Sequence, residues 1–314
     1  MGKQSGNQIY DLTLHSGFSS LFGCSQDELL SNFSKYIPLY AKKLQMSEVR
    51  FLSELKKWYN GYSWDADNSL YNPFSLLCFF SGDGFSNYWF STCTPHFLNN
   101  LIKENNFDIF YFRNYFASES SLDTNDFDQI SLSNLLFQTG YFTIKKKKSV
   151  NGRLSYGLDF PNFEVQESLF GYLFADVTGS DYGKVSYRST MLSESLQNEQ
   201  FDEFLTTLKS LFAQIPSNLF ISEEKYYHSL FIMIMYLSGI KVESNVNTNI
   251  GRIDGVIEFL DKTYLIEFKY NIPPKDSFQQ IKQKKYYEKI LSSGKRLILA
   301  GVGFTRSDIL LAVE

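Results

Sequence analysis

The amino-acid sequence predicts an α/β (α+β) chain whose last third is a mixed sheet flanked by helices. From residue 221 to 301 the pattern indicates a helix, three strands, a helix and a strand. That order places helices on both faces of a sheet. The region before it predicts a mostly helical domain with a lysine-rich β-hairpin. A chain of 314 residues is long enough for two domains.

The composition is typical of a folded protein, because 43% of the residues are hydrophobic and 20% are charged. The formal net charge of −4 excludes a polycation, so a nucleic acid would have to bind a local basic face. The polar N-terminus shows no signal peptide, and no apolar run is long enough to span a bilayer. We therefore expect a cytoplasmic protein without a membrane partner. Secretion without a cleaved signal is the alternative.

The first segment, residues 1–110, is expected to be a helical domain. A helix is predicted over 25–44, opened by a serine N-cap and acidic residues in the first turn. A second helix is predicted over 47–58. Aromatic and turn-forming residues at 58–63 and 70–75 then predict a loop.

The second segment, residues 111–215, is expected to be a helical connector with a basic β-hairpin. A helix ends at Gly140, and Asn151-Gly152 between two β-like runs is a strong hairpin signal. The four lysines 145–148 could contact a nucleic-acid backbone. They could also protect an exposed edge strand from aggregation, and this second interpretation is preferred.

The third segment, residues 216–314, carries the sheet. Its first helix is predicted over 221–237, with Ser222 as the N-cap. The remaining elements are a β-like run, a hairpin, a helix and a strand, expected near 241–245, 251–269, 276–291 and 296–301.

The hairpin carries ionisable residues within apolar runs, where a charge is costly to bury. Folded across a turn at 260–263, it places Asp254 opposite the segment that holds Glu267 and Lys269. Because side chains alternate along a strand, Glu267 and Lys269 share one face and Phe268 points into the core. Two neighbouring carboxylates favour a divalent cation such as Mg²⁺, and the ammonium could position a water or offset charge on a phosphate. The pattern indicates metal-assisted phosphodiester hydrolysis, against the alternative of a surface ion pair.

At these residues the sequence resembles the PD-(D/E)XK nuclease superfamily, in the bacterial branch that follows an AAA-ATPase-like domain. The resemblance runs from about 222 to 304 and rests on five strings: Glu224–His228, Gly251–Asp254, Glu267–Lys269, Phe278–Ile281 with Lys284–Tyr286, and Leu297–Phe304. It implies a restriction-endonuclease-like fold and a Mg²⁺- or Mn²⁺-dependent endonuclease, a hydrolase that acts on DNA rather than RNA.

The resemblance also implies roles for individual residues. Asp254, Glu267 and the backbone carbonyl of Phe268 would bind the metal. Lys269, Glu224 and Gln280 would complete the catalytic set. Substrate contacts would come from His228, Arg252, Lys282, Lys284, Lys285 and Tyr286.

Two of these roles have ordinary alternatives. A local hydrogen bond is the slightly preferred role for His228. The lysines near 282–289 could equally form a solvated helix face.

The N-terminal aromatic strings resemble the C-terminal helical part of the AAA-ATPase-like domain, and the basic hairpin resembles the wing of a winged-helix module. No phosphate-binding loop of the form G-x-x-x-x-G-K-[ST] occurs, so we expect neither ATP binding nor ATP hydrolysis. The alternative function is a catalytically inactive nuclease-fold module that binds nucleic acid or a protein partner. That alternative includes a toxin or effector bound by a cognate antidote.

Overall fold

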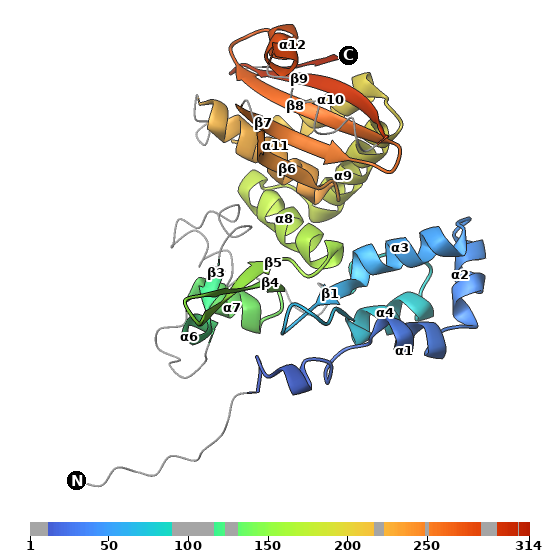
Figure 1. Ribbon diagram of the computed structural model, residues 1–314. Coiled ribbons are helices and arrows are strands. Elements are labelled where there is room, and N and C mark those ends of the chain that lie inside the picture. The colour runs from blue at the N-terminus through green and yellow to red at the C-terminus, as the bar shows by residue number, and fades with distance from the viewer. Residues whose placement is uncertain are drawn as a thin grey trace. The chain divides into compact units, whose positions relative to one another are not determined.

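The computed structural model of the protein describes residues 12–89, 116–122, 131–216, 223–248, 251–283, 294–306 and 308–314. The chain forms two compact units, Met1–Ser168 and Leu169–Glu314 (Figure 1). The three segments predicted from the sequence, with borders at 110 and 215, remain a prediction. Among the described residues, no helix combines the length and the apolar character needed to cross a membrane.

The first unit begins with short helices around an aromatic core. They are η1 (Ser16–Phe18), α1 (Gln26–Asn32), α2 (Tyr36–Lys43), α3 (Glu48–Tyr59) and α4 (Pro73–Ser81). Ser25 caps α1 through a capping box with Glu28, as the sequence predicted. The single helix predicted over 25–44 is wrong, because the chain turns at Phe33, whose ring stacks on Phe80 at 4.5 Å.

The aromatic loop predicted after α3 is partly wrong as well. Its residues pair as two short antiparallel strands, β1 (Asn60–Tyr62) and β2 (Leu70–Tyr71). The turn between them is held by Asp65, whose Oδ1 accepts hydrogen bonds from the backbone N–H groups of Asp67 and Asn68. A side-chain acceptor of this kind replaces the backbone bonds that a longer ladder would supply.

A three-stranded sheet in the order β3-β5-β4 follows in the same unit. Its elements are β3 (Phe116–Ser118), α6 (Glu119–Leu122), α7 (Leu132–Gln138), β4 (Thr143–Val150) and β5 (Arg153–Asp159). The predicted hairpin is confirmed: Asn151 and Gly152 have φ of 53° and 76°, as a tight two-residue turn requires. In the described sheet β4 lies at an edge, where Lys146–Lys148 could protect it, whereas Lys145 Nζ donates to the carbonyls of Gly61 and Pro161.

The first turns of α8 (Phe163–Thr178) fix the loop that follows α4. Glu164 is fully buried, and its carboxylate accepts hydrogen bonds from the Ser75 hydroxyl and from the backbone N–H groups of Tyr88 and Trp89. Burial raises the pKa of Glu164 to about 7, even though these hydrogen bonds act in the opposite direction.

The second unit contains the predicted mixed sheet. Its strands, in spatial order, are β10 (Ile309–Val313), β9 (Arg296–Phe304), β8 (Lys262–Tyr270), β7 (Gly251–Glu258) and β6 (Val242–Thr248). Among the described strands, β8 and β9 pair in parallel and the other neighbours pair antiparallel. Its helices are α9 (Tyr182–Gln197), α10 (Phe201–Phe212), α11 (Glu224–Leu237) and α12 (Pro274–Gln283).

Helices cover both faces of this sheet (Figure 1). On one face, Ile281 of α12 packs with Leu265 and Leu299. On the other face, side chains of α9, α10 and α11 surround Tyr264 and Ile266. Successive residues of β8 therefore point alternately towards α12 and towards the three-helix layer.

Two boundaries differ from those predicted. The proposed N-cap, Ser222, lies outside the described residues, and α11 instead begins at Glu224 after Glu223, which makes no side-chain cap bond. Lys262 belongs to β8 rather than to the preceding turn, because it pairs with Arg296 of β9, and its buried ammonium donates to the Gln197 carbonyl at 2.6 Å and to Glu199 at 2.7 Å.

Candidate active site

The β7–β8 hairpin brings Asp254 to Glu267. The antiparallel register runs from Glu258↔Thr263 to Gly255↔Ile266, so the next position places Asp254 opposite Glu267. At that point Asp254 Oδ2 accepts a hydrogen bond from the backbone N–H of Phe268 at 2.9 Å. The hydrogen bond fixes the aspartate where the ladder ends.

Glu267 and Lys269 lie on the face predicted from strand alternation. Lys269 Nζ donates to Glu267 Oε1 at 3.2 Å, and the Glu267 side chain is only 1% exposed. Phe268 points to the other face, where its ring contacts Phe231 at a centroid distance of 4.9 Å. Three of the predicted residues, Asp254, Glu267 and Lys269, are thus brought together on the hairpin.

Strand β9 adds two glycines that were not among the predicted site residues. The parallel register pairs Glu267 with Gly301 and Lys269 with Gly303. Paired residues of neighbouring strands share a face, so β9 has no side chain beside these two residues. The alternation Gly-Val-Gly in an otherwise apolar strand could have indicated this, because glycine within a strand often marks close approach of a ligand or backbone.

Glu224 and His228 lie on α11, in the layer that packs against the Phe268 face. The His228 ring is 4.6 Å from the Phe268 ring, centroid to centroid. Within the described parts of the chain, no group of three or more His, Cys, Asp or Glu side chains is arranged to hold a metal ion. The structure therefore does not bring Glu224 into a three-residue cluster with Asp254 and Glu267.

The other predicted substrate contacts are less well defined. Gln280 lies on α12 and Arg252 on β7, and for both the structure describes only the backbone. Lys282, at the end of α12, makes an exposed ion pair with Glu314 at 2.5 Å. Lys284, Lys285 and Tyr286 lie outside the described residues.

The donor set fits a hard divalent cation. Mg²⁺ is usually bound through one or two carboxylates, with waters or substrate phosphates supplying its other ligands. Asp254 and Glu267 provide two carboxylates on adjacent strands, and their backbones are held by the ladder. Mn²⁺ prefers similar oxygen ligands.

Fold and site together define the class of this region. A mixed sheet flanked by helices, with two carboxylates and a lysine on its hairpin, is a restriction-endonuclease-like domain. Residues 222–313 match the PD-(D/E)XK nuclease superfamily, which confirms the resemblance seen in the motifs. The resemblance of the first segment to an AAA-ATPase-like region stays a prediction.

A relative matches most of the chain. An uncharacterized protein in the vnfD 5′ region of Azotobacter chroococcum mcd 1 is 31% identical over 309 residues. The alignment covers 96% of this chain and 58% of that protein, so the chain spans little more than half of the relative's length. No solved structure matches the chain.

Proposed function

We propose that this protein is a divalent-metal-dependent nuclease that hydrolyses phosphodiester bonds, with DNA as the favoured substrate. The observation that supports the proposal best is the position of Asp254 beside Glu267, with Lys269 in contact with that glutamate. The preference for DNA over RNA rests on the resemblance to PD-(D/E)XK nucleases. ATP is not required in this proposal.

Each residue has a distinct role. Asp254, oriented by the Phe268 N–H, and Glu267 would hold Mg²⁺ or Mn²⁺. When bound, such an ion activates a water and neutralises charge on the phosphate. Lys269 lies within reach of the same carboxylate, so its ammonium can donate a hydrogen bond to the attacking water or to a phosphate oxygen. Gly301 and Gly303 leave the neighbouring strand without side chains on this face.

The second candidate is an inactive nuclease fold that binds nucleic acid or a protein, including an antidote protein. Two observations favour it: Lys269 donates a hydrogen bond to Glu267, and the described residues include no group of three or more side chains that could hold a metal. A structural ion pair would have this geometry too.

Cleavage by matched variants separates the two candidates. Parent, Asp254→Asn and Lys269→Met proteins are incubated with plasmid, linear duplex, single-stranded DNA and RNA, in Mg²⁺, Mn²⁺ or EDTA. Asn keeps an oxygen that can accept from the Phe268 N–H, so the fold is retained while the carboxylate charge is lost. We expect both variants to lose at least about a hundredfold in rate, as when a group that stabilises the transition state is removed.

The control is Glu258→Gln, which alters an exposed carboxylate at the last residue of the same strand. Its rate should equal that of the parent. Cleavage at the parental rate by Asp254→Asn would show that the site assignment is wrong.

A further inference from the structure

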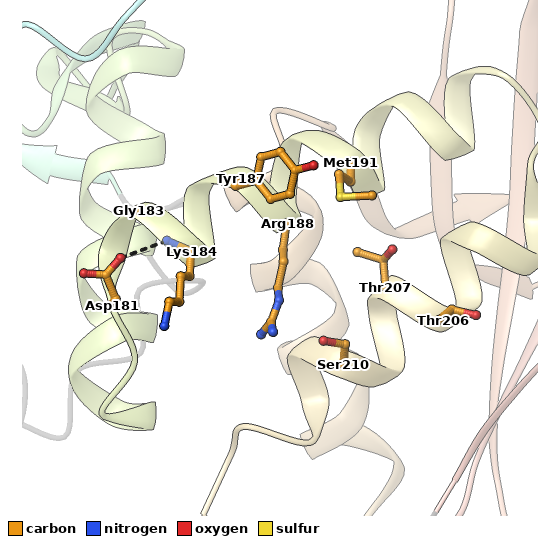
Figure 2. A pocket seen from close by; sticks show the side chains of 9 residues that line it. All are labelled: Asp181, Gly183, Lys184, Tyr187, Arg188, Met191, Thr206, Thr207 and Ser210. Atoms are coloured by element: carbon orange, nitrogen blue, oxygen red, sulfur yellow. Dashed lines mark hydrogen bonds between the residues drawn. The ribbon is translucent and has the colours of Figure 1, made fainter.

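We propose that the groove between α9 and α10 is a second contact surface for a nucleic-acid phosphate backbone, separate from the cleavage site. This inference rests on the proposed nuclease function. The groove measures about 580 Å³, and its lining combines cationic, hydroxyl and aromatic side chains. It is lined by Asp181, Gly183, Lys184, Tyr187, Arg188, Met191, Thr206, Thr207 and Ser210 (Figure 2).

Two cations extend from α9 on the same side. Lys184 and Arg188 are four residues apart, so they lie one helical turn from each other (Figure 2). Neither makes an ion pair with a described residue, whereas Lys209, Lys262 and Lys282 of the same unit all do. Two unpaired cations on one groove favour an anionic ligand.

The acidic residue in the groove does not neutralise them. Asp181 is the N-cap of α9, and its Oδ1 accepts a hydrogen bond from the backbone N–H of Lys184 at 3.1 Å. It contributes one negative charge against two positive charges. The groove therefore keeps a net positive charge in a chain whose formal charge is −4.

Hydroxyl groups line the opposite side, on α10. Thr206 is exposed and donates to the Asp202 carbonyl, and Ser210 is half-buried, whereas Thr207 is largely buried at 8% exposed. Hydroxyls beside Lys and Arg are common phosphate contacts in nucleic-acid complexes. Tyr187 is 66% exposed and could stack on a base next to the groove.

The shape of the groove selects the kind of anion. A small-molecule site encloses most of its ligand. Here Lys184 and Tyr187 are exposed, and a single phosphate would fill only part of 580 Å³. Carbon atoms make up most of the exposed lining, but it includes Lys184 and Asp181, residue types that are depleted from protein interfaces. A nucleic-acid backbone lying along the two helices fits the groove better than a small anion or a protein partner does.

The groove and the proposed cleavage site lie on opposite faces of the sheet. Side chains of α9 and α10 pack against the sheet face of Ile266, the face opposite Glu267. Nucleic acid in the groove is therefore outside the cleavage position, and its contact adds affinity for longer substrates rather than catalysis.

The test is the salt dependence of binding. Affinity for a labelled DNA duplex of about 30 base pairs, and for an RNA duplex of equal length, is measured in EDTA between about 50 and 200 mM salt, the range in which phosphate contacts change affinity most clearly. Each neutralised phosphate adds about 0.9 to the slope of log K against log salt for B-DNA. We expect the Lys184→Glu/Arg188→Glu double variant to bind DNA with a slope shallower by about 1.8.

The matched control is Lys241→Glu/Lys295→Glu, which changes the net charge equally at two cations that form ion pairs elsewhere on the unit. Its slope should stay near the parental one. An unchanged slope in the groove variant, or an equal change in the control, would show that the groove does not bind the phosphate backbone. If the parent binds neither DNA nor RNA, the proposed function itself fails.

Discussion

Lys269 stands where it can serve either a metal site or an ion pair. Its ammonium contacts Glu267, which is the carboxylate a divalent cation would need. A cation and an ammonium beside one carboxylate repel each other, and the repulsion is large where water is scarce. Lysine and metal therefore oppose each other in binding, even if both are required for cleavage.

This opposition predicts different metal affinities for two inactive variants. Lys269→Met should bind Mn²⁺ at least as tightly as the parent, because a like charge is removed. Asp254→Asn should bind it more weakly, because a ligand charge is lost. Titration followed by electron paramagnetic resonance measures both without reference to cleavage.

Loss of Mn²⁺ affinity in Lys269→Met would indicate that the lysine holds Glu267 in place. Glu258→Gln serves as the control, since that carboxylate is exposed and paired with Lys295.

Strand alternation was enough to predict the positions of Glu267, Phe268 and Lys269, because period two is fixed by local geometry. Gly301 and Gly303 could not be assigned to the site in the same way. They reach it through a parallel pairing with a strand much later in the chain, and no local pattern specifies that register. His228 could not be placed from sequence either, since its distance from Phe268 depends on how α11 packs.

At the scale of single elements, the first residue of β8, Lys262, anchors the strand to the end of α9 through hydrogen bonds. The Lys262 side chain is 5% exposed, and its ammonium joins the Gln197 carbonyl and Glu199. Arg296, which opens β9, contacts the same glutamate. The two parallel strands thus begin at one shared carboxylate next to the end of α9.

Lys262→Met should lower the free energy of unfolding by about 2 kcal/mol, because a buried carbonyl loses a charged hydrogen-bond donor. Urea unfolding followed by far-UV circular dichroism measures the change. Lys241→Met is the comparison, since Lys241 is 73% exposed and its pair with Glu243 spans 3.6 Å. Equal effects of the two substitutions would contradict this account.

Element boundaries were harder to predict than the elements themselves. The polar turn residues around Lys262 gave no sign that this lysine is buried, because its partners come from the distant end of α9. The break between α1 and α2 depends on the contact of Phe33 with Phe80, another distant residue. The Asn151-Gly152 turn was predictable because its positive φ angles are a property of those two residues.

At the scale of the whole molecule, the stability of the first unit should depend on pH through Glu164. Its pKa rises from 4.5 in the unfolded chain to about 7 in the folded one, because the carboxyl is buried. Between these values the folded form holds a proton that the unfolded form lacks. Stability therefore falls as pH rises from about 4.5 to about 7, and this contribution is constant above that range.

Glu164→Gln should remove this contribution, so its stability relative to the parent should increase between pH 5 and pH 8, by an amount on the order of 3 kcal/mol. Gln keeps an oxygen for the N–H groups of Tyr88 and Trp89. All three tryptophans, Trp58, Trp64 and Trp89, belong to the first unit, so their fluorescence follows this unfolding selectively. A pH-independent difference between the two proteins would refute the assignment.

The class of the second unit could be predicted from the order of its elements and from the residues on one hairpin. The α9–α10 groove could not, because Lys184 and Arg188 are ordinary helix residues in the sequence. Their significance depends on the hydroxyl groups that another helix, α10, places beside them. Long-range packing, rather than weak local propensity, limits what could be expected from the sequence.

The parallel pairing of β8 with β9 also determines at which stage of synthesis the sheet around Glu267 can be completed. Until residues 296–304 leave the ribosome, β8 has an open edge beside Glu267, and the strand that completes that side does not yet exist. A product that stops short of β9 would keep Asp254, Glu267 and Lys269 but have no finished sheet to hold them. The side of β8 that carries Glu267 and Lys269 is therefore completed only after β9 has been synthesised, although Asp254 and its partners on the hairpin come earlier in the chain.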